Sequence, residues 1–144
     1  MIYFDSSALV KRYVQEVGSD TVNSLLDGTA VAATSRLAYP EILSALTRRH
    51  NAADIETSSF ERVKNQFKID WEYFTVVEMR AEVLQYIDRI IDRYALRGAD
   101  SIHLSTAVWL KQKVKQEVVF VASDLELLNG AKLEKLKVLN PQAG

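Results

Sequence analysis

Short apolar runs, rich in β-branched and aromatic residues, recur along the chain without strict alternation of apolar and polar positions. This pattern is typical of parallel strands that are covered on both faces. Four clear runs and a weaker fifth predict strands at Ile2–Phe4, Ala30–Thr34, Phe74–Val77, Val118–Ala122 and Lys137–Leu139. Together they indicate a mainly parallel sheet.

Between these runs the apolar residues recur every three or four positions, as they do on the buried face of a helix. Such stripes predict helices around residues 22–26, over 36–50, over 54–70, from Met79 to Tyr94 and from Gly98 onward. Gly98 also suits the end of the helix before it, where a positive φ is often needed.

The alternation of strands and helices implies right-handed parallel crossovers. We therefore expect an α/β fold with three layers, in which a mainly parallel five-stranded sheet lies between helices. The 144 residues fit a single domain over 1–144. Two helical segments separate the second strand from the third, so one helix pair is expected to depart from the simple alternation.

Composition and charge narrow the function classes. The chain is 48% hydrophobic and 26% charged and has no cysteine, which excludes disulfides and thiolate metal sites. A net charge of −1 excludes a broadly basic surface but allows a basic rim around an acidic centre. The chain shows no signal-peptide pattern and no apolar run near the ~20 residues of a membrane span. We expect a cytoplasmic protein with no membrane partner.

Acidic residues stand where parallel sheets carry their sites, which is at the carboxyl ends of the strands. Asp5 directly follows the first strand, and Asp124 follows the fourth. Glu41 falls about two turns into the helix after the second strand. Asp100 lies in the first turn of the helix that leads into the fourth strand. The last two reach this edge only if their helices pack as the fold class predicts.

Each acid also has a purely structural explanation. Asp5 and Asp124 suit helix N-caps, and Asp100 suits a first turn, where it complements the helix dipole. Glu41 could be a solvated helix carboxylate. Asp100 and Glu41 nevertheless border apolar stripes, which favours a fixed position for both. Pro40 lacks a backbone donor, so the aim of Glu41 depends on whether its helix begins late or kinks.

Four carboxylates gathered at one edge repel one another. At ~5 Å and an effective dielectric near 20, each pair costs about 3 kcal/mol. Such a cluster takes up protons or binds a cation. An all-oxygen ligand set of this kind suits Mg²⁺ or Mn²⁺, and either ion can activate a water and neutralise charge on a phosphodiester. We therefore predict a divalent-metal site formed by Asp5, Glu41, Asp100 and Asp124, with the chemistry to act on a phosphodiester.

The four acids lie in four segments that follow one another across nearly the whole chain: Ile2–Lys11, Pro40–Leu46, Leu96–Ala107 and Val119–Leu128. In these segments the sequence resembles the PIN-domain ribonucleases, and in particular the toxin members of VapBC-type toxin–antitoxin pairs. The first and third segments are the most specific, and the second is weak in isolation.

This resemblance implies a five-stranded parallel sheet and an endoribonuclease that cleaves single-stranded RNA with Mg²⁺ or Mn²⁺. It assigns the acidic quartet to Asp5, Glu41, Asp100 and Asp124. It also implies that Ser6 and Ser123 are polar supports around the quartet. A toxin of this family is held inactive by a cognate antitoxin protein and usually forms a homodimer.

Basic and aromatic residues near the motifs have more than one interpretation. Four basic side chains are candidates for RNA phosphate contacts, with solvation or a salt bridge as the alternative: Lys11, Arg12, Arg36 and Arg97. His103 lies three residues after Asp100 and could be a ligand or base, but we expect a core-edge histidine bonded to the backbone. We expect Trp71, Tyr73 and Trp109 to be core or interface residues.

Two other functions compete with the nuclease. One is a catalytically silent PIN-like module that only binds RNA or protein. The other is a phosphatase or phospho-acceptor domain with Asp5 as nucleophile. A dehalogenase-like phosphatase would need a second Asp two residues on, where the chain has Ser7. A receiver-like domain would need a Lys near the end of a late strand, where the chain has Ser123 and Asp124.

Overall fold

The computed structural model describes residues 1–143, and its centre is a parallel sheet of five strands in the order β3-β2-β1-β4-β5. The strands are β1 (Ile2–Phe4), β2 (Ala32–Ser35), β3 (Thr75–Val77), β4 (Val119–Val121) and β5 (Lys137–Leu139). The helices are α1 (Ser6–Leu9), the 3₁₀ turn η1 (Val10–Arg12), α2 (Ser19–Asp27), α3 (Ala38–Asn51), α4 (Thr57–Trp71), α5 (Ile87–Tyr94), α6 (Gly98–Val114) and α7 (Leu125–Leu133). The expected α/β fold is confirmed.

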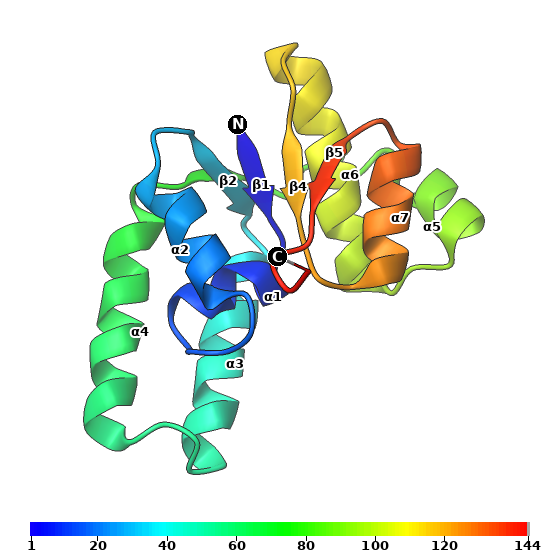
Figure 1. Ribbon diagram of the computed structural model, residues 1–144. Helices are drawn as coiled ribbons and strands as arrows, with labels where there is room; N and C mark the ends of the chain where they lie inside the picture. Colours follow the sequence, from blue (N-terminus) through cyan, green and yellow to red (C-terminus); the bar gives the residue numbers. More distant parts are fainter. Residues whose placement is uncertain (144) are drawn as a thin grey trace.

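Helices cover both faces of the sheet (Figure 1). Successive side chains of a strand point to opposite faces, and β1 supplies both cores. Tyr3 is fully buried with α5, α6 and α7, and its ring stacks on Phe120 at a centroid distance of 5.5 Å. Ile2 and Phe4 pack on the other face with α1 to α4. This burial on both faces explains why the strands read as apolar runs.

The helix pair α3 and α4 is the expected departure from the simple alternation. The two helices lie side by side and extend beyond the sheet in Figure 1. Aromatic side chains hold them together: Phe67 packs edge-on against Trp71, and Tyr39 contacts both. The buried Trp71 is thus a core residue, as predicted, whereas the side chain of Tyr73 is 83% exposed.

The strand order reverses direction at β1. The chain runs outward from β1 to β2 and β3, and then returns to place β4 on the other side of β1. Open parallel sheets bind ligands at such a switch point, outside the carboxyl ends of the strands. The residues that follow β1 and β4 therefore meet at this edge. Within residues 1–143, no helix has the length and apolar character needed to cross a membrane.

Two local predictions were wrong. The apolar stripe from Met79 to Tyr94 is helical only from Ile87, because residues 81–86 form successive turns, with Val83 N bonded to Arg80 O. Tight turns bury apolar residues at the same spacing as a helix does. Gly98 is the first residue of α6 and does not end α5. The left-handed position at the end of α5 belongs to Ala95, with φ 52°.

The observed bounds of the strands and the observed start of α3 differ from the predicted ones by only a few residues. The second strand lies at Ala32–Ser35, slightly later than the predicted Ala30–Thr34. Helix α3 begins at Ala38, so Pro40 lies in its first turn. Backbone donors of a first turn have no partner within the helix, so the missing N–H costs no helical bond. The late start leaves the direction of Glu41 undisturbed.

Candidate active site

All four predicted acids line one pocket of about 340 Å³ at the carboxyl edge of the sheet. Its wall is made by residues from α1, α3, α6 and the start of α7: Asp5, Ser6, Ser7, Glu41, Arg97, Ala99, Asp100, His103 and Asp124. The helices that carry Glu41 and Asp100 therefore pack as the fold class predicts, so that both acids reach this edge of the sheet.

Asp5 is the most buried of the acids, with 3% of its surface exposed. It caps α1: Oδ1 accepts from Ala8 N at 2.8 Å, and both carboxylate oxygens accept from Ser7 Oγ, at 3.1 and 3.0 Å. Burial raises the pKa of Asp5 from 3.8 to about 6, although these donors and His103 oppose the rise. Asp5 is thus both a helix N-cap and a site residue, because the carboxylate that caps α1 also lines the pocket.

Glu41 is fixed through one of its two oxygens. Ser6 Oγ donates to Oε1, and His103 Nε2 lies 3.0 Å from the same atom. Burial raises the pKa of Glu41, but these two hydrogen bonds outweigh it, so the net pKa is lowered and the carboxylate stays charged. Within residues 1–143 the other oxygen, Oε2, has no hydrogen-bond partner. It is free to accept from a ligand.

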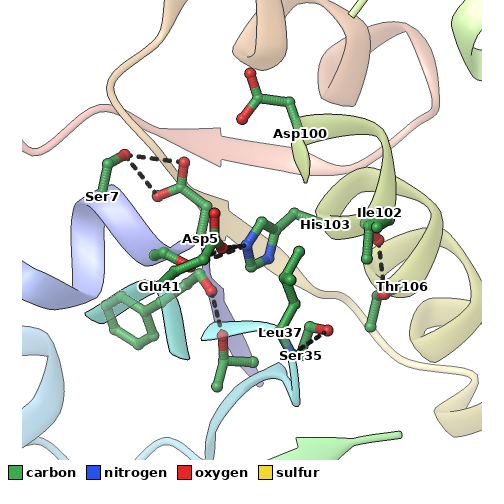
Figure 2. Close-up of polar contacts among 12 residues, drawn as sticks. Asp5, Ser7, Ser35, Leu37, Glu41, Asp100, Ile102, His103 and Thr106 are labelled. Atoms are coloured by element: carbon green, nitrogen blue, oxygen red, sulfur yellow. Dashed lines mark hydrogen bonds and ion pairs between the residues drawn. The ribbon is translucent and has the colours of Figure 1, made fainter. Parts of the chain in front are cut away.

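His103 joins the sheet to this carboxylate (Figure 2). The ring is 2% exposed, and Nδ1 lies 2.8 Å from the hydroxyl of Tyr3 on β1. Burial and the charge of Asp5 raise the pKa of Tyr3 well above its ordinary value, so the phenol keeps its proton and donates to Nδ1. An ionised Glu41 can only accept, so we assign the ring proton to Nε2. The predicted backbone bonding of His103 was wrong: its partners are side chains.

Asp100 and Asp124 share the guanidinium of Arg97 as their positively charged partner. Arg97 Nη2 lies 3.6 Å from Asp100 Oδ2 and 4.0 Å from Asp124 Oδ2. Burial raises the pKa of Asp100, Arg97 lowers it, and the negative charge of Asp124 raises it again. Asp124 also caps α7, because its Oδ1 accepts from Leu127 N at 2.9 Å. With its side chain 83% exposed, Arg97 can leave these acids without disturbing the core.

The other three basic candidates lie in ion pairs outside the pocket. Lys11 is 4% exposed and its Nζ lies 3.0 Å from Glu16, so its charge is buried and already paired. Arg12 pairs with Asp27, and Arg36 pairs with Glu78. The salt-bridge alternative is the one observed for all three residues.

The donor set of the pocket fits a divalent cation. Its acids offer carboxylate oxygens only, which is the chemistry of Mg²⁺ and Mn²⁺ sites. Buried Asp5, with its raised pKa, would regain full ionisation beside a cation. Ser123 Oγ, next to Asp124, is buried and lacks a hydrogen-bond partner within residues 1–143. The same residues contain no group of three His, Asp or Glu side chains already arranged around a metal position. In Figure 2 the Asp100 carboxylate stands apart from Asp5 and Glu41.

Three residues of the site were not singled out by sequence reasoning in the roles that they have. Tyr3 reads as an ordinary strand residue, and Ser7 reads as part of a short motif. The sequence indicates His103 as a possible ligand or base, but it does not indicate the partners of the ring. The only signal in the sequence was a histidine one turn after Asp100, on a helix whose other face is apolar. Its contact with Tyr3 joins residues 100 positions apart, which no local pattern records.

Known proteins resemble the chain in sequence and in fold. The family model of the PIN domain matches residues 2–133. The chain is 40% identical over 115 residues to Ribonuclease VapC45 of Mycobacterium tuberculosis (strain CDC 1551 / Oshkosh), with 75% of each covered. A toxin–antitoxin complex from Klebsiella pneumoniae contains a similar fold, with a TM-score of 0.67, 14% identity and 98% of both chains covered. VapBC2 from Rickettsia felis, bound to a DNA fragment from its promoter, gives a TM-score of 0.66 at 13% identity, with 97% of this chain and 98% of that chain covered. The two structural likenesses show the fold alone.

Proposed function

Because the chain belongs to the PIN-domain family, we propose that it is a metal-dependent endoribonuclease that cleaves single-stranded RNA. The observation that carries this proposal is the convergence of Asp5, Glu41, Asp100 and Asp124 on one pocket at the switch point of the sheet. The name of the 40% identical relative, a ribonuclease, supports the choice of substrate.

In this proposal the four carboxylates hold Mg²⁺ or Mn²⁺. When bound, such an ion lowers the pKa of a water and neutralises charge that develops on the phosphodiester. Ser6 and His103 hold Glu41 Oε1, which leaves Oε2 directed to the ligand. Arg97, which balances Asp100 and Asp124 in the free protein, is placed to move onto a phosphate oxygen of the RNA. Ser123 serves as a polar support beside Asp124.

The experiment is a cleavage assay on single-stranded RNA with Mg²⁺ or Mn²⁺, in which Asp5→Asn and Asp100→Asn are compared with the wild type. Equal cleavage by all three proteins would assign the activity to a contaminant and remove the site. The catalytically silent PIN-like module is the alternative. Calorimetry with no heat of Mn²⁺ binding up to millimolar concentration would select that alternative.

We further propose that the protein is the toxin of a type II toxin–antitoxin pair and acts as a homodimer in the cytoplasm. The support for the antitoxin partner is the structural neighbour from Klebsiella pneumoniae, which is a toxin–antitoxin complex, together with the family. The homodimer and the cytoplasm rest on the sequence resemblance alone. The expected partner is the protein product of a small adjacent open reading frame. This protein should copurify with the chain and suppress its nuclease activity. Light scattering of the purified chain tests the dimer. A mass equal to that of one chain would contradict it.

A further inference from the structure

The acidic pocket is the middle of a longer cleft. It shares Ser6, Ser7 and Glu41 with a groove of about 500 Å³ that runs along α3. Through Arg97, Asp100 and Asp124 it also adjoins a second groove of about 480 Å³ beside the start of α7. The two sets of shared residues are different, so the cleft continues on both sides of the acids. An internal segment of an RNA strand can therefore cross the pocket.

The groove along α3, which we name the α3 arm, has one polar wall. Glu41, Ser44, Ala45 and Arg48 face it at positions i, i+3, i+4 and i+7, which is a single stripe of the helix. The small side chains of Ser44 and Ala45 keep the groove open. Arg48 lies seven residues beyond Glu41, about 10 Å along the helix axis. The arm thus places a cation at a fixed distance from the acids.

The charge of Arg48 is not neutralised within the fold. Its guanidinium donates to Ser44 Oγ at 2.6 Å, and within residues 1–143 no carboxylate lies within ion-pair distance of it. The neighbouring Arg49, in contrast, pairs with Glu16 at 2.6 Å. The rest of the groove wall includes the apolar side chains of Val10, Leu37 and Pro40. A cation that no carboxylate neutralises, beside hydroxyls and in a groove continuous with the acidic pocket, suits the phosphates of a polyanionic backbone.

The groove beside α7 is less suited to phosphate. Its wall includes Arg97, which is already shared between Asp100 and Asp124, and it adds the carboxylate of Glu126. Phosphate contacts are made mainly by Arg, Lys and small polar side chains. Of the two grooves, only the α3 arm therefore carries an arginine that no carboxylate neutralises.

We propose that the α3 arm holds the RNA strand on one side of the scissile bond, with the Arg48 guanidinium on a backbone phosphate. This inference rests on the proposed nuclease function and adds a binding subsite to it. A strand that occupies the cleft on both sides of the acids is cut internally, in agreement with endonucleolytic cleavage.

The test measures RNA binding without cleavage. Fluorescence anisotropy in EDTA follows a labelled single-stranded RNA of about 12 nucleotides, a length within the usual range for single-strand sites. Arg48→Ala is expected to weaken binding roughly fivefold and to reduce the slope of log K against log salt by about 0.7, the value for one single-strand phosphate contact. Arg62→Ala, at an exposed position on α4 outside the cleft, is the control for loss of one surface charge.

A second variant guards against a folding defect. Ser44→Glu places a carboxylate four residues before Arg48, an arrangement that stabilises a helix. It neutralises the arginine without removing it. We expect an unchanged or higher melting temperature together with RNA binding as weak as that of Arg48→Ala.

Loss of affinity and of salt slope in the Arg48 and Ser44 variants, with Arg62→Ala like the wild type, supports the subsite. Wild-type binding by the Arg48 and Ser44 variants overturns it, as does an equal loss in Arg62→Ala. In either case, cleavage by the wild type in Mg²⁺ leaves the proposed function intact. Variants that bind RNA normally but lose affinity for a protein partner would show that the arm is a protein interface, and the inference would be wrong. A wild type that neither binds nor cleaves RNA overturns the proposed function itself.

Discussion

Nε2 of His103 lies 3.0 Å from Oε1 of Glu41, and the opposite ring nitrogen lies 2.8 Å from the hydroxyl of Tyr3. Strand β1, helix α6 and helix α3 are thereby connected through three side chains. The strand fixes the tyrosine, the tyrosine fixes the tautomer of the ring, and the ring holds one carboxylate oxygen. Residues that hydrogen-bond to a metal-binding side chain hold that side chain in the correct orientation.

Replacing this histidine tests the connection. His103→Phe keeps a flat aromatic ring, although a larger one, and removes both hydrogen bonds. It leaves the Tyr3 hydroxyl buried without its partner. We expect a loss of about 1–3 kcal/mol in the free energy of unfolding and a loss of roughly tenfold or more in Mn²⁺ affinity. Denaturation and calorimetry measure the two effects. His50→Phe, in the last turn of α3 and outside the pocket, should keep wild-type Mn²⁺ affinity. A His103→Phe protein with unchanged Mn²⁺ affinity would show that the ring does not position Glu41.

The raised pKa of Asp5 predicts a pH-dependent stability in the metal-free protein. Because folding raises this pKa from 3.8 to about 6, the fold favours the protonated form. The contribution is fully present below the ordinary pKa and is lost as pH rises through about 6. Two pKa units correspond to about 3 kcal/mol. Asp5→Asn, which also caps helices well, should lack this decline.

Urea denaturation in EDTA between pH 4 and 7 measures the difference between wild type and Asp5→Asn. The comparison cancels other groups, such as Glu41, whose pKa is lowered and whose contribution has the opposite sign. Parallel stability curves for the two proteins would contradict the raised pKa of the buried Asp5 carboxyl.

Much of the site could be predicted from local sequence. Asp5 and Asp124 follow apolar runs, and a residue that follows a parallel strand lies at the carboxyl edge whatever the order of the strands. Pro40 raised a doubt that the late start of α3 removes. The link between Tyr3 and His103 could not be predicted, because it depends on which helix crosses β1. The turns before α5 were missed because they bury apolar residues at helical spacing.

Arg97 predicts opposite effects on the two ligands of the site. In the free protein it balances Asp100 and Asp124, so it competes with a divalent cation. An exposed ion pair contributes about 0.2–1 kcal/mol, and Arg97→Ala should therefore bind Mn²⁺ up to about fivefold more tightly. The same change should weaken binding of single-stranded RNA, because a phosphate contact is lost. Calorimetry and anisotropy measure the two affinities, and a change of both in the same direction would contradict this role.

Asp124, which lines the same pocket as Asp5, gives a direct prediction for the metal. Asp124→Asn keeps a capping side chain for α7 but removes one negative charge from the pocket. Since the affinity of an oxygen site depends strongly on its charge, we expect Mn²⁺ to bind at least about tenfold more weakly, with little change in melting temperature. Asp92→Asn, on the exposed side of α5, is the matched control. Equal affinities in the two variants would exclude Asp124 from the metal site.

RNA cleavage by Asp100→Asn and Asp92→Asn decides the claim that the four carboxylates form one nuclease centre. Both variants lose one acid, but only Asp100 lines the pocket. With single-stranded RNA and saturating Mg²⁺ or Mn²⁺, we expect Asp92→Asn to cleave like the wild type. Asp100→Asn should be slower by about 100-fold or more, since it loses several kcal/mol of charge stabilisation at the metal. Cleavage by Asp100→Asn at the wild-type rate, or no metal-dependent cleavage by the wild type, would contradict the claim.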